Sequence, residues 1–404
     1  MAEKTQGVSL IWKITIGFIL GVAFGRFASP AMLVWTHPLG SIFMSLLKML
    51  IVPLVLSSLI GGVASLGDLR SLGRIGIKTV VIFLITTAIA IAIGLALGDM
   101  IRPGAGMDLA LAKATEGKVA PSLGQVLIDM FPTNIYSSMV KANMLQIIVF
   151  ALFFGIAATM AGEKGKPVLD FFNSMAEVMY KVTAIVMDFA PYGVFALIAD
   201  TVAKYGPAVL LPFAKTIFCV YLGCIIHAVV VYGGLVGLFA HKTPGWFFGG
   251  IKEASIMAFV TRSSSGTLPV TMECCHKMGI PDKVSSFVLP LGATINMDGT
   301  ALYQGVCALF IAQAFGIPLN MSAQLGVLVT ATLGSIGTAG VPGGGLIMLT
   351  LVTTQAGLPI EGVAMVAGID AILDMARTSL NITGDCAVAA VVARGEGSDL
   401  VPEK

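Results

Sequence analysis

Three acidic residues and one arginine lie within a single long apolar segment near the C-terminus, between residues 368 and 385. With about 100° of rotation per residue in an α-helix, six polar residues of this segment share one face and project within roughly 100° of Asp370. These residues are Asp370, Asp374, Arg377, Thr378, Asn381 and Asp385. A charge at the centre of a bilayer costs about 2.5 kcal/mol or more, and such side chains line bundle interiors or aqueous cavities. The stripe predicts a site for a charged solute; internal salt bridges between helices are the alternative.

The side-chain types indicate which solute the stripe would bind. Arg377 has the planar fork that holds a carboxylate bidentately, and Asp374, one turn earlier on the same face, can accept an ammonium. Two interrupted segments, 262–266 and 340–343, supply hydroxyls or free amide N–H groups at helix N-termini, whose partial positive charge favours a carboxylate. A ligand with two carboxylates and one ammonium satisfies all these groups. We therefore expect an acidic α-amino acid.

The remaining acids suit a hard cation. Asp298 lies beside Asn296 in a stretch that we expect to be unwound, and Asp385 lies on the stripe. Carboxylate, amide and backbone carbonyl oxygens are ligands for hard cations, and transporters hold sodium at the unwound carbonyls of broken helices. The hydroxyls of Thr86 and Thr87, in the middle of an earlier apolar run, either join such a site or bond to carbonyls of their own helix.

The composition indicates a polytopic membrane protein. Hydrophobic residues make up 56% of the 404 residues and charged residues only 11%, whereas soluble domains carry about 25% charged residues. The net charge of +2, without a basic patch interleaved with aromatics, argues against a nucleic-acid partner. The six cysteines and four histidines show no metal-site spacing. We expect buried free thiols and, for His227, a hydrogen-bonded interior side chain.

Apolar runs long enough to cross a bilayer, about 20 residues each, recur along the first part of the chain. They cover residues 10–27, 39–66, 79–101, 145–160, 171–189 and 208–240. Basic linkers at 68–78, 162–167 and 241–244 predict the cytoplasmic side, and no cleavage site follows the first run, so we expect it to be kept as a span. We expect a multi-pass membrane protein.

From residue 244 onward, polar or glycine-rich stretches interrupt the apolar runs. The runs 246–278, 284–315 and 323–358 are broken within 261–269, 296–300 and 334–345, and the charged helix over 363–393 follows. A hairpin-like segment followed by a full span thus occurs twice. Paired Gly/Pro-interrupted segments are typical of inverted-repeat transporters, with the binding site at the junction of the repeats. Non-helical backbone survives at membrane depth only where it is buried in protein or faces water.

At these residues the sequence resembles the dicarboxylate/amino acid:cation symporter family, the prokaryotic sodium-coupled aspartate/glutamate transporters related to the animal excitatory amino acid transporters. The resemblance extends along nearly the whole chain, including Phe-Pro-Thr-Asn at 131–134. Its most specific motifs are Thr-Arg-Ser-Ser-Ser-Gly-Thr-Leu-Pro at 261–269, Asn-Met-Asp-Gly-Thr at 296–300, Gly-Thr-Ala-Gly-Val-Pro-Gly at 337–343 and the segment 374–385.

The resemblance implies an all-α polytopic membrane protein with eight transmembrane helices and two re-entrant helical hairpins, built as inverted repeats in the glutamate-transporter-like elevator fold. It also implies a homotrimer in the lipid bilayer of the cytoplasmic (inner) membrane of a prokaryote, multi-pass, with both termini in the cytoplasm. The scaffold would comprise residues 1–78 (spans one and two) and 102–201 (an external loop with spans four and five). The mobile transport domain would comprise 79–101 (span three) and 202–404 (span six, first hairpin, span seven, second hairpin, span eight), with the second hairpin as the extracellular gate.

The resemblance further implies the ligands of each bound species. Substrate contacts would be Arg262, Ser264, Met297, Thr300, Val341, Gly345, Asp374, Arg377, Thr378 and Asn381. One sodium ion would use Gly292, Asn296, Asn381 and Asp385; a second would use Thr294, Ser335, Ile336 and Thr338; a third would use Phe83, Thr86, Thr87, Asn296 and Asp298. Relatives have tyrosine at position 83, so only a role of its backbone carbonyl is expected for Phe83.

Three positions discriminate within this family. Arg377 is the mark of acidic side-chain recognition, and Asp374 argues for a ligand with an ammonium, because the plain C4-dicarboxylate branch lacks this acid. Gln304 stands where the proton-coupled animal carriers have glutamate, and an amide cannot titrate. We therefore expect import of L-aspartate, with or without L-glutamate, coupled to several Na⁺ ions. The alternative is a proton-coupled symporter for glutamate or C4-dicarboxylates.

An enzyme is the competing class of function. Asp370 and Asp374 lie four residues apart on one helix, whereas an aspartyl protease needs two facing carboxylates that share a proton. The serines at 263–265 have no evident His or Lys base nearby. We therefore expect no enzymatic activity.

Overall fold

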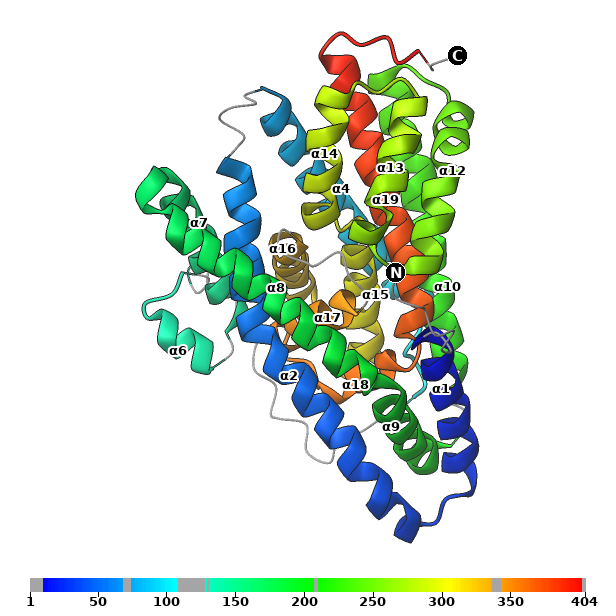
Figure 1. Cartoon of the computed structure of the whole chain (residues 1–404). Helices are drawn as coiled ribbons and strands as arrows, with labels where there is room; N and C mark the ends of the chain where they lie inside the picture. The colour runs from blue at the N-terminus through cyan, green and yellow to red at the C-terminus, as the bar shows by residue number, and fades with distance from the viewer. Residues whose placement is uncertain are drawn as a thin grey trace, which may run out of the picture.

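The computed structural model describes residues 10–67, 74–107, 128, 131–141, 143–206, 210–335 and 343–401. Every regular element within these ranges is a helix, which confirms the all-α fold class. Figure 1 shows the helices in two groups, one in the left and lower part of the view and one forming an upright bundle that ends at the C-terminus.

The first group contains the N-terminal helices and the helices of the chain's middle part. They are α1 (Leu10–Phe27), α2 (Pro30–Gly67), α6 (Ile135–Val140), α7 (Met144–Met160), α8 (Lys166–Asp188) and α9 (Ala190–Tyr205). The long helix α2 packs against α7, α8 and α9, and α1 packs against α9. The sequence analysis predicted the apolar runs that correspond to α1, α2, α7 and α8 but none over α9, which follows α8 after a bend of 51°.

The close packing of α1 on α9 follows from glycines spaced four residues apart. They are Gly17, Gly21 and Gly25. Since residues four apart share one helix face, the three leave a smooth strip along α1. A Cβ atom at these positions would lie 2.5–2.7 Å from backbone oxygens of α9, those of Pro191, Phe195 and Ala199. Small residues of this kind let helix backbones approach one another in apolar surroundings.

The second group surrounds the C-terminal helix α19 (Asp370–Gly395), which packs most extensively against α12, α14 and α15. The group comprises α4 (Arg74–Ile101), α10 (Leu210–Ile226), α12 (Pro244–Thr261), α13 (Ser264–Lys277), α14 (Asp282–Ile295), α15 (Asp298–Ala314), α16 (Met321–Ser335), α17 (Gly344–Gln355) and α18 (Glu361–Ala367). Helix α4 packs most extensively along α15.

Two of the predicted helix breaks are confirmed. Between α12 and α13, Arg262 takes a left-handed backbone conformation (φ 55°), and the Ser263 side chain accepts the N–H of Gly266 at the start of α13. Between α14 and α15, Asn296 and Met297 leave the helix. Of the third predicted break, 334–345, residues 336–342 lie outside the described residues, while α16 ends at Ser335 and α17 begins at Gly344.

The structure adds two irregularities that the apolar pattern did not predict. The C-terminal segment is interrupted at Gly368 and Ile369, so α18 and α19 are separate helices. After α10 the chain winds into the π-helical segment η3 (His227–Tyr232), one α-turn α11 (Gly233–Leu235) and a second π-helical segment η4 (Val236–Ala240). Neither irregularity interrupts the apolar pattern of the sequence, so hydropathy and periodicity could not reveal it.

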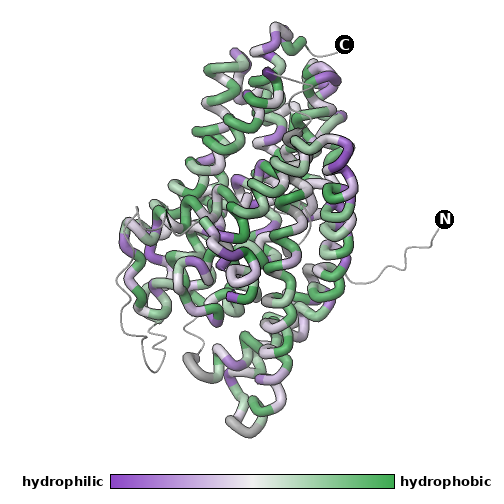
Figure 2. Tube along the Cα trace, turned by 90° about the vertical axis from the view of Figure 1, so that its left-hand side faces the viewer, coloured by the Kyte–Doolittle hydropathy of each residue, from purple (hydrophilic) through white to green (hydrophobic). Residues whose placement is uncertain are grey.

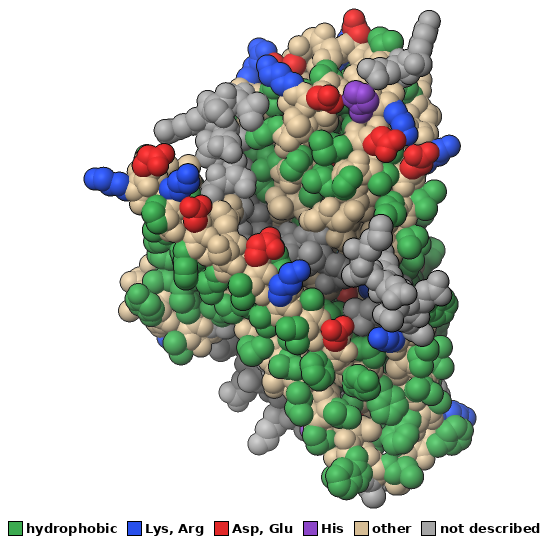
Figure 3. Space-filling view, viewed as in Figure 1, with side chains coloured by type: hydrophobic (Ala, Val, Ile, Leu, Met, Phe, Trp, Pro, Cys, Tyr) green, Lys and Arg blue, Asp and Glu red, His purple; other side chains and the backbone are tan. Residues whose placement is uncertain are grey.

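Length and hydropathy single out three described helical stretches that can cross a membrane, Met32–Gly61, Arg74–Ile101 and Leu210–Ala240, or four if the bent pair α8 and α9 forms one span. Figure 2 shows hydrophobic residues along most of the chain trace. In Figure 3, apolar side chains cover the lower part of the visible face, while acidic and basic side chains gather mostly in its upper half. The apolar surface fits a protein surrounded by lipid.

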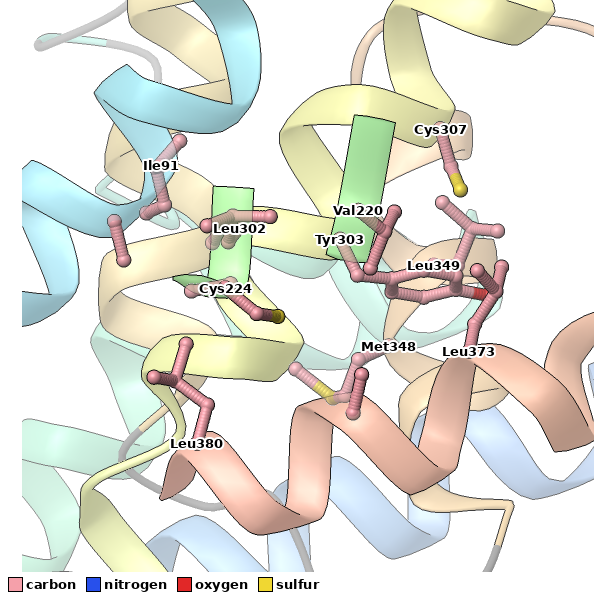
Figure 4. Close-up of a cluster of buried hydrophobic side chains, with 14 of the residues drawn as sticks. Ile91, Val220, Cys224, Leu302, Tyr303, Cys307, Met348, Leu349, Leu373 and Leu380 are labelled. Atoms are coloured by element: carbon pink, nitrogen blue, oxygen red, sulfur yellow. The ribbon is translucent and has the colours of Figure 1, made fainter. Parts of the chain in front are cut away.

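An apolar cluster fixes the helices around α19. It contains side chains of α4, α10, α15, α17 and α19, among them Ile91, Val220, Cys224, Leu302, Leu349, Leu373 and Leu380 (Figure 4). All are buried. Close packing of this kind holds the polar face of α19 in register with α15 and α17. All six cysteines are buried and free, as expected from their spacing.

Candidate functional site

Arg377 lies at the centre of the polar stripe and is completely buried. Its Nη1 donates to Asp370 Oδ1 at 2.8 Å and its Nη2 donates to Asp374 Oδ1 at 2.7 Å. Helical spacing brings the three side chains together because residues three and seven positions apart lie on one face. These ion pairs lie within α19, so they are not the salt bridges between helices that the sequence left as an alternative, and they use both Nη atoms of the guanidinium.

One atom of each of two side chains in these ion pairs has no hydrogen-bond partner in the described part of the chain. Arg377 Nε and Asp374 Oδ2 are both buried and have no hydrogen-bond partner among the described residues. A buried polar group without a partner costs about 1–3 kcal/mol, and more when the group is charged. An incoming ligand with a carboxylate and an ammonium could supply both missing partners.

The guanidinium is held between an aromatic ring and a glycine. Arg377 Cζ lies 4.0 Å from the centroid of the Tyr303 ring on α15, close enough for a cation–π interaction. On the α17 side, a Cβ atom on Gly345 would lie 2.7 Å from Arg377 Cζ. The charged face of α19 therefore contacts the first turn of α17, at the end of the third predicted break.

The unwound stretch between α14 and α15 is tied to α19 by Asn381. The Asn381 Oδ1 accepts the backbone N–H of Gly299 at 2.8 Å. Its Nδ2 lies 3.2 Å from the Met297 sulfur and 3.4 Å from Thr300 Oγ1. Three predicted substrate contacts, Met297, Thr300 and Asn381, are thus brought together from two helices.

A second polar group joins Asn296 to Asp385. Asn296 Nδ2 donates to Asp385 Oδ1 at 2.9 Å and to the Asn381 carbonyl at 3.1 Å, while Asn296 Oδ1 is buried without a partner among the described residues. A Cβ at position 292 would lie 2.3 Å from Asp385 Oδ1, so a larger residue there would displace this carboxylate. The carbonyl of Gly292 accepts the N–H of Asn296 at 2.8 Å.

The two threonines of α4 differ in their partners. Thr86 Oγ1 donates to the Phe83 carbonyl at 3.1 Å, so it bonds within its own helix. Thr87 Oγ1 donates instead to Asp298 Oδ1 at 2.5 Å. The Phe83 ring is buried and would lie 3.1 Å from a Cβ on Gly292. Asp298 and Thr87 are thus in contact across α4 and α15.

Two residues that contact Asp298 were not predicted as site residues. His227 Nε2 lies 3.1 Å and Tyr232 Oη 2.6 Å from Asp298 Oδ2. The sequence analysis expected His227 to be buried and hydrogen-bonded, which is confirmed. His227 and Tyr232 are two ionisable residues five positions apart within an apolar run. This spacing is the signal in the sequence that could have suggested a shared partner.

The remaining predicted site residues are described by their burial or by hydrogen bonds within their own helices. Arg262 and Ser264 are buried at the break between α12 and α13, and Thr378 is buried on α19. The hydroxyls of Thr294 and Ser335 bond to carbonyls of their own helices, those of Leu291 and Thr332. The predicted ligands Ile336, Thr338 and Val341 lie outside the described residues.

Known proteins resemble this chain over nearly its full length. A model of the sodium:dicarboxylate symporter family matches residues 10–395. The chain is 41% identical over 401 residues to a proton/sodium-glutamate symport protein of Geobacillus stearothermophilus, covering 96% of this chain and 95% of the relative. It is 38% identical over 412 residues to a proton/glutamate-aspartate symporter of Escherichia coli (strain K12), covering 97% and 94%. It is 34% identical over 403 residues to a C4-dicarboxylate transport protein of Anaeromyxobacter sp. (strain K), covering 98% and 91%.

Proposed function

Because the chain belongs to the sodium:dicarboxylate symporter family, we propose that it imports an acidic amino acid, L-aspartate with or without L-glutamate, together with sodium ions. The members of this family are symporters, so the chain is a transporter and not an enzyme. The observation that carries the proposal is the pair of buried, unpartnered atoms on one face of α19, Arg377 Nε and Asp374 Oδ2.

An acidic amino acid supplies what this pair lacks. Its ammonium can donate to Asp374 Oδ2, and its side-chain carboxylate can accept from Arg377. Asp370 and Asp374 each take one of the five N–H donors of the guanidinium. The Nε hydrogen and a second Nη hydrogen remain for a bidentate contact with the substrate carboxylate, so the guanidinium stays paired throughout, as a buried charge requires.

Sodium coupling is supported by oxygen atoms near this pair. Asn296 Oδ1 is buried and unpartnered among the described residues, close to Asp385, and Asp298 Oδ1 lies beside the Thr87 hydroxyl. Carboxylate, amide and hydroxyl oxygens are the ligand types that hard cations prefer. Asn381 links this region to Met297 and Thr300, so cation and substrate binding would share side chains.

We propose the domain division and assembly that the resemblance implies. Residues 1–78 and 102–201 would form the scaffold, and residues 79–101 and 202–404 the transport domain, in an eight-span elevator fold with two re-entrant hairpins. The extensive packing of α4 on α15 supports placing span three with the C-terminal half. The homotrimer and the orientation in the inner membrane, with both termini cytoplasmic, belong to the same proposal.

Uptake into proteoliposomes tests the function directly. Purified protein should accumulate labelled L-aspartate when an inward sodium gradient is imposed, and unlabelled L-aspartate inside should stimulate exchange. A proton gradient in sodium-free potassium buffer is the comparison. Equal uptake under the proton gradient would overturn sodium coupling while leaving the substrate assignment intact.

The second candidate is a proton-coupled symporter for glutamate or C4-dicarboxylates. It is favoured by the names of the relatives, two of which mention protons and one of which is a C4-dicarboxylate transport protein. Against the dicarboxylate version stands Asp374, whose free oxygen would face a ligand without an ammonium. Strong competition by succinate for labelled aspartate would support that version.

A further inference from the structure

Asp298 lies in a buried cage of three hydrogen-bond donors that come from two other parts of the chain. Thr87 of α4 donates to Oδ1, and His227 and Tyr232 of η3 donate to Oδ2 at 3.1 and 2.6 Å. None of these four side chains is more than 1% exposed. The two carboxylate oxygens are therefore used differently, one toward α4 and the other toward η3.

The π-helical winding is what brings both η3 donors to the same oxygen. In an ordinary α-helix, two residues five positions apart point about 140° away from each other. In a π-helix the hydrogen bonds join residues i and i+5, so such residues lie one above the other. Accordingly, the rings of His227 and Tyr232 meet edge to face at 4.7 Å, and both contact Asp298 Oδ2.

A glycine of α19 completes this arrangement. A Cβ atom on Gly384 would lie 2.3 Å from Tyr232 Oη and 2.4 Å from Asn296 Nδ2. Tyr232 and Asn296 therefore converge on the bare backbone next to Asp385. The cage is thus continuous with the polar group that contains the unpartnered Asn296 Oδ1.

We propose that His227 and Tyr232 are positioning residues for a sodium ion that binds at Asp298. By holding Oδ2 from one side, they fix the carboxylate plane so that Oδ1 stays beside Thr87 and faces the cation. Carboxylates that bind metal ions are oriented in this way by outer partners, and loss of such a partner typically weakens binding about 10- to 100-fold. This inference rests on the proposed sodium coupling and extends it to two residues that do not touch the ion.

The hydrogen-bond partners of the two His227 ring nitrogens agree with a donor role for Nε2. With Nε2 carrying the hydrogen toward Asp298, Nδ1 is left as an acceptor, and Nδ1 has no partner among the described residues. A donor of similar reach but without the ring, as in His227→Gln, can replace the Nε2–H contact. A side chain without any donor, as in His227→Leu, cannot.

The test measures sodium binding by calorimetry, with choline chloride as the reference salt, on purified full-length protein. Tyr232→Phe and His227→Leu are expected to raise the sodium dissociation constant about 10-fold or more. His227→Gln should bind sodium with an affinity much closer to that of the parent. L-aspartate affinity at saturating sodium should stay within about twofold of the parent. Thr216→Val is the control, because Thr216 is buried in α10 and its hydroxyl bonds only to the Pro212 carbonyl of its own helix.

The outcomes separate this inference from the function on which it rests. Unchanged or tighter sodium binding in Tyr232→Phe and His227→Leu would overturn the positioning role, the tighter result meaning that the donors compete with the ion. Equal losses in His227→Leu and His227→Gln would also overturn it. A parent protein that releases no heat with sodium would overturn sodium coupling and this inference together. A sodium-dependent rise in the melting temperature, reduced in the same variants, provides the second readout.

Discussion

The residue at position 345 controls how closely the backbone of α17 approaches the Arg377 guanidinium. With glycine there is no atom between the first turn of α17 and the charged group, and an added Cβ would lie 2.7 Å from Cζ and 2.8 Å from Nη2. Such a contact is too short for real Cβ atoms, and both partners are buried. The guanidinium would have to move away from the place where its Nη atoms meet Asp370 and Asp374.

Gly345→Ala should therefore weaken L-aspartate binding about 10-fold or more, since misplacement of a charge-assisted hydrogen bond costs about 1.5–3 kcal/mol. Calorimetric titration with aspartate at saturating sodium measures this. Gly326→Ala in α16 is the matched control, because nothing lies within 4 Å of a Cβ at that position. Parent-like aspartate affinity in Gly345→Ala would show that the guanidinium does not contact the substrate from this place.

Arg377→Ala should abolish measurable uptake of acidic substrates and admit neutral amino acids, because the only buried guanidinium of the stripe segment 368–385 is removed. The change also leaves two carboxylates without their partner, and an unpaired buried charge is strongly destabilising. Arg377→Ala combined with Asp370→Asn relieves part of this repulsion. Competition assays with labelled aspartate and a panel of neutral amino acids decide the matter, and retained aspartate affinity in the folded double variant would contradict the assignment.

At the scale of helices, the glycine strip of α1 is a packing device. Gly21→Ala should push α1 away from α9, because its Cβ would lie 2.7 Å from the Phe195 carbonyl oxygen. Overpacking of this kind costs about 1–3 kcal/mol, which corresponds to several degrees of melting temperature. Gly249→Ala, with no atom within 4 Å of the new Cβ, should melt like the parent. Both are measured by thermal unfolding in detergent, and sodium affinity should not change in either.

A cluster of charges joins the start of α4 to the end of α19. Glu396 accepts from Arg74 Nη2 and Lys78 Nζ, both at 2.8 Å. The hydrogen bond from Arg74, and next that from Lys78, lowers the pKa of Glu396 to about 2. Because this pKa lies below the usual glutamate value of about 4.3, the stabilisation is fully present above that value and is lost as the pH falls toward 2.

Glu396→Gln should consequently lower the melting temperature slightly at pH 7, since the pair is exposed and exposed ion pairs are weak. The difference from the parent should shrink as the pH is lowered from about 4.3 to about 2. Melting curves over this pH range test the sign. Glu163→Gln, an exposed glutamate elsewhere on the surface, is the control, and a difference that grows in acid would contradict the role of the cluster.

At the scale of the whole molecule, large apolar side chains remain exposed on both helix groups. Examples on the first group are Ile42, Phe153, Phe171 and Val178. A bilayer covers such surfaces, and so can other copies of the chain. Native mass spectrometry of the detergent-solubilised protein should give three times the mass of the 41.9 kDa chain. A single-chain mass in mild detergents that preserve other membrane oligomers would contradict the trimer.

The sequence by itself determined the features that depend on neighbours along the chain. The helical class, the breaks at 261–269 and 296–300 and the polar face of α19 all follow from local periodicity and from the cost of burying charge in an apolar layer. The same cost indicated that Arg377, Asp374 and Asp385 belong to a binding site for a charged solute. The family resemblance then assigned each of them a ligand. A third break was predicted at 334–345, and its residues 336–342 lie outside the described ranges.

Only the tertiary structure decided which polar groups meet. That Thr87 and His227 converge on Asp298 depends on helix packing and on a π-helical winding that leaves no trace in hydropathy. Thr87 and Asp298 are separated by 211 positions, and no local spacing encodes such a contact. The physical reason is that helix propensity acts over a few residues, whereas a buried hydrogen bond needs a partner from wherever packing supplies it.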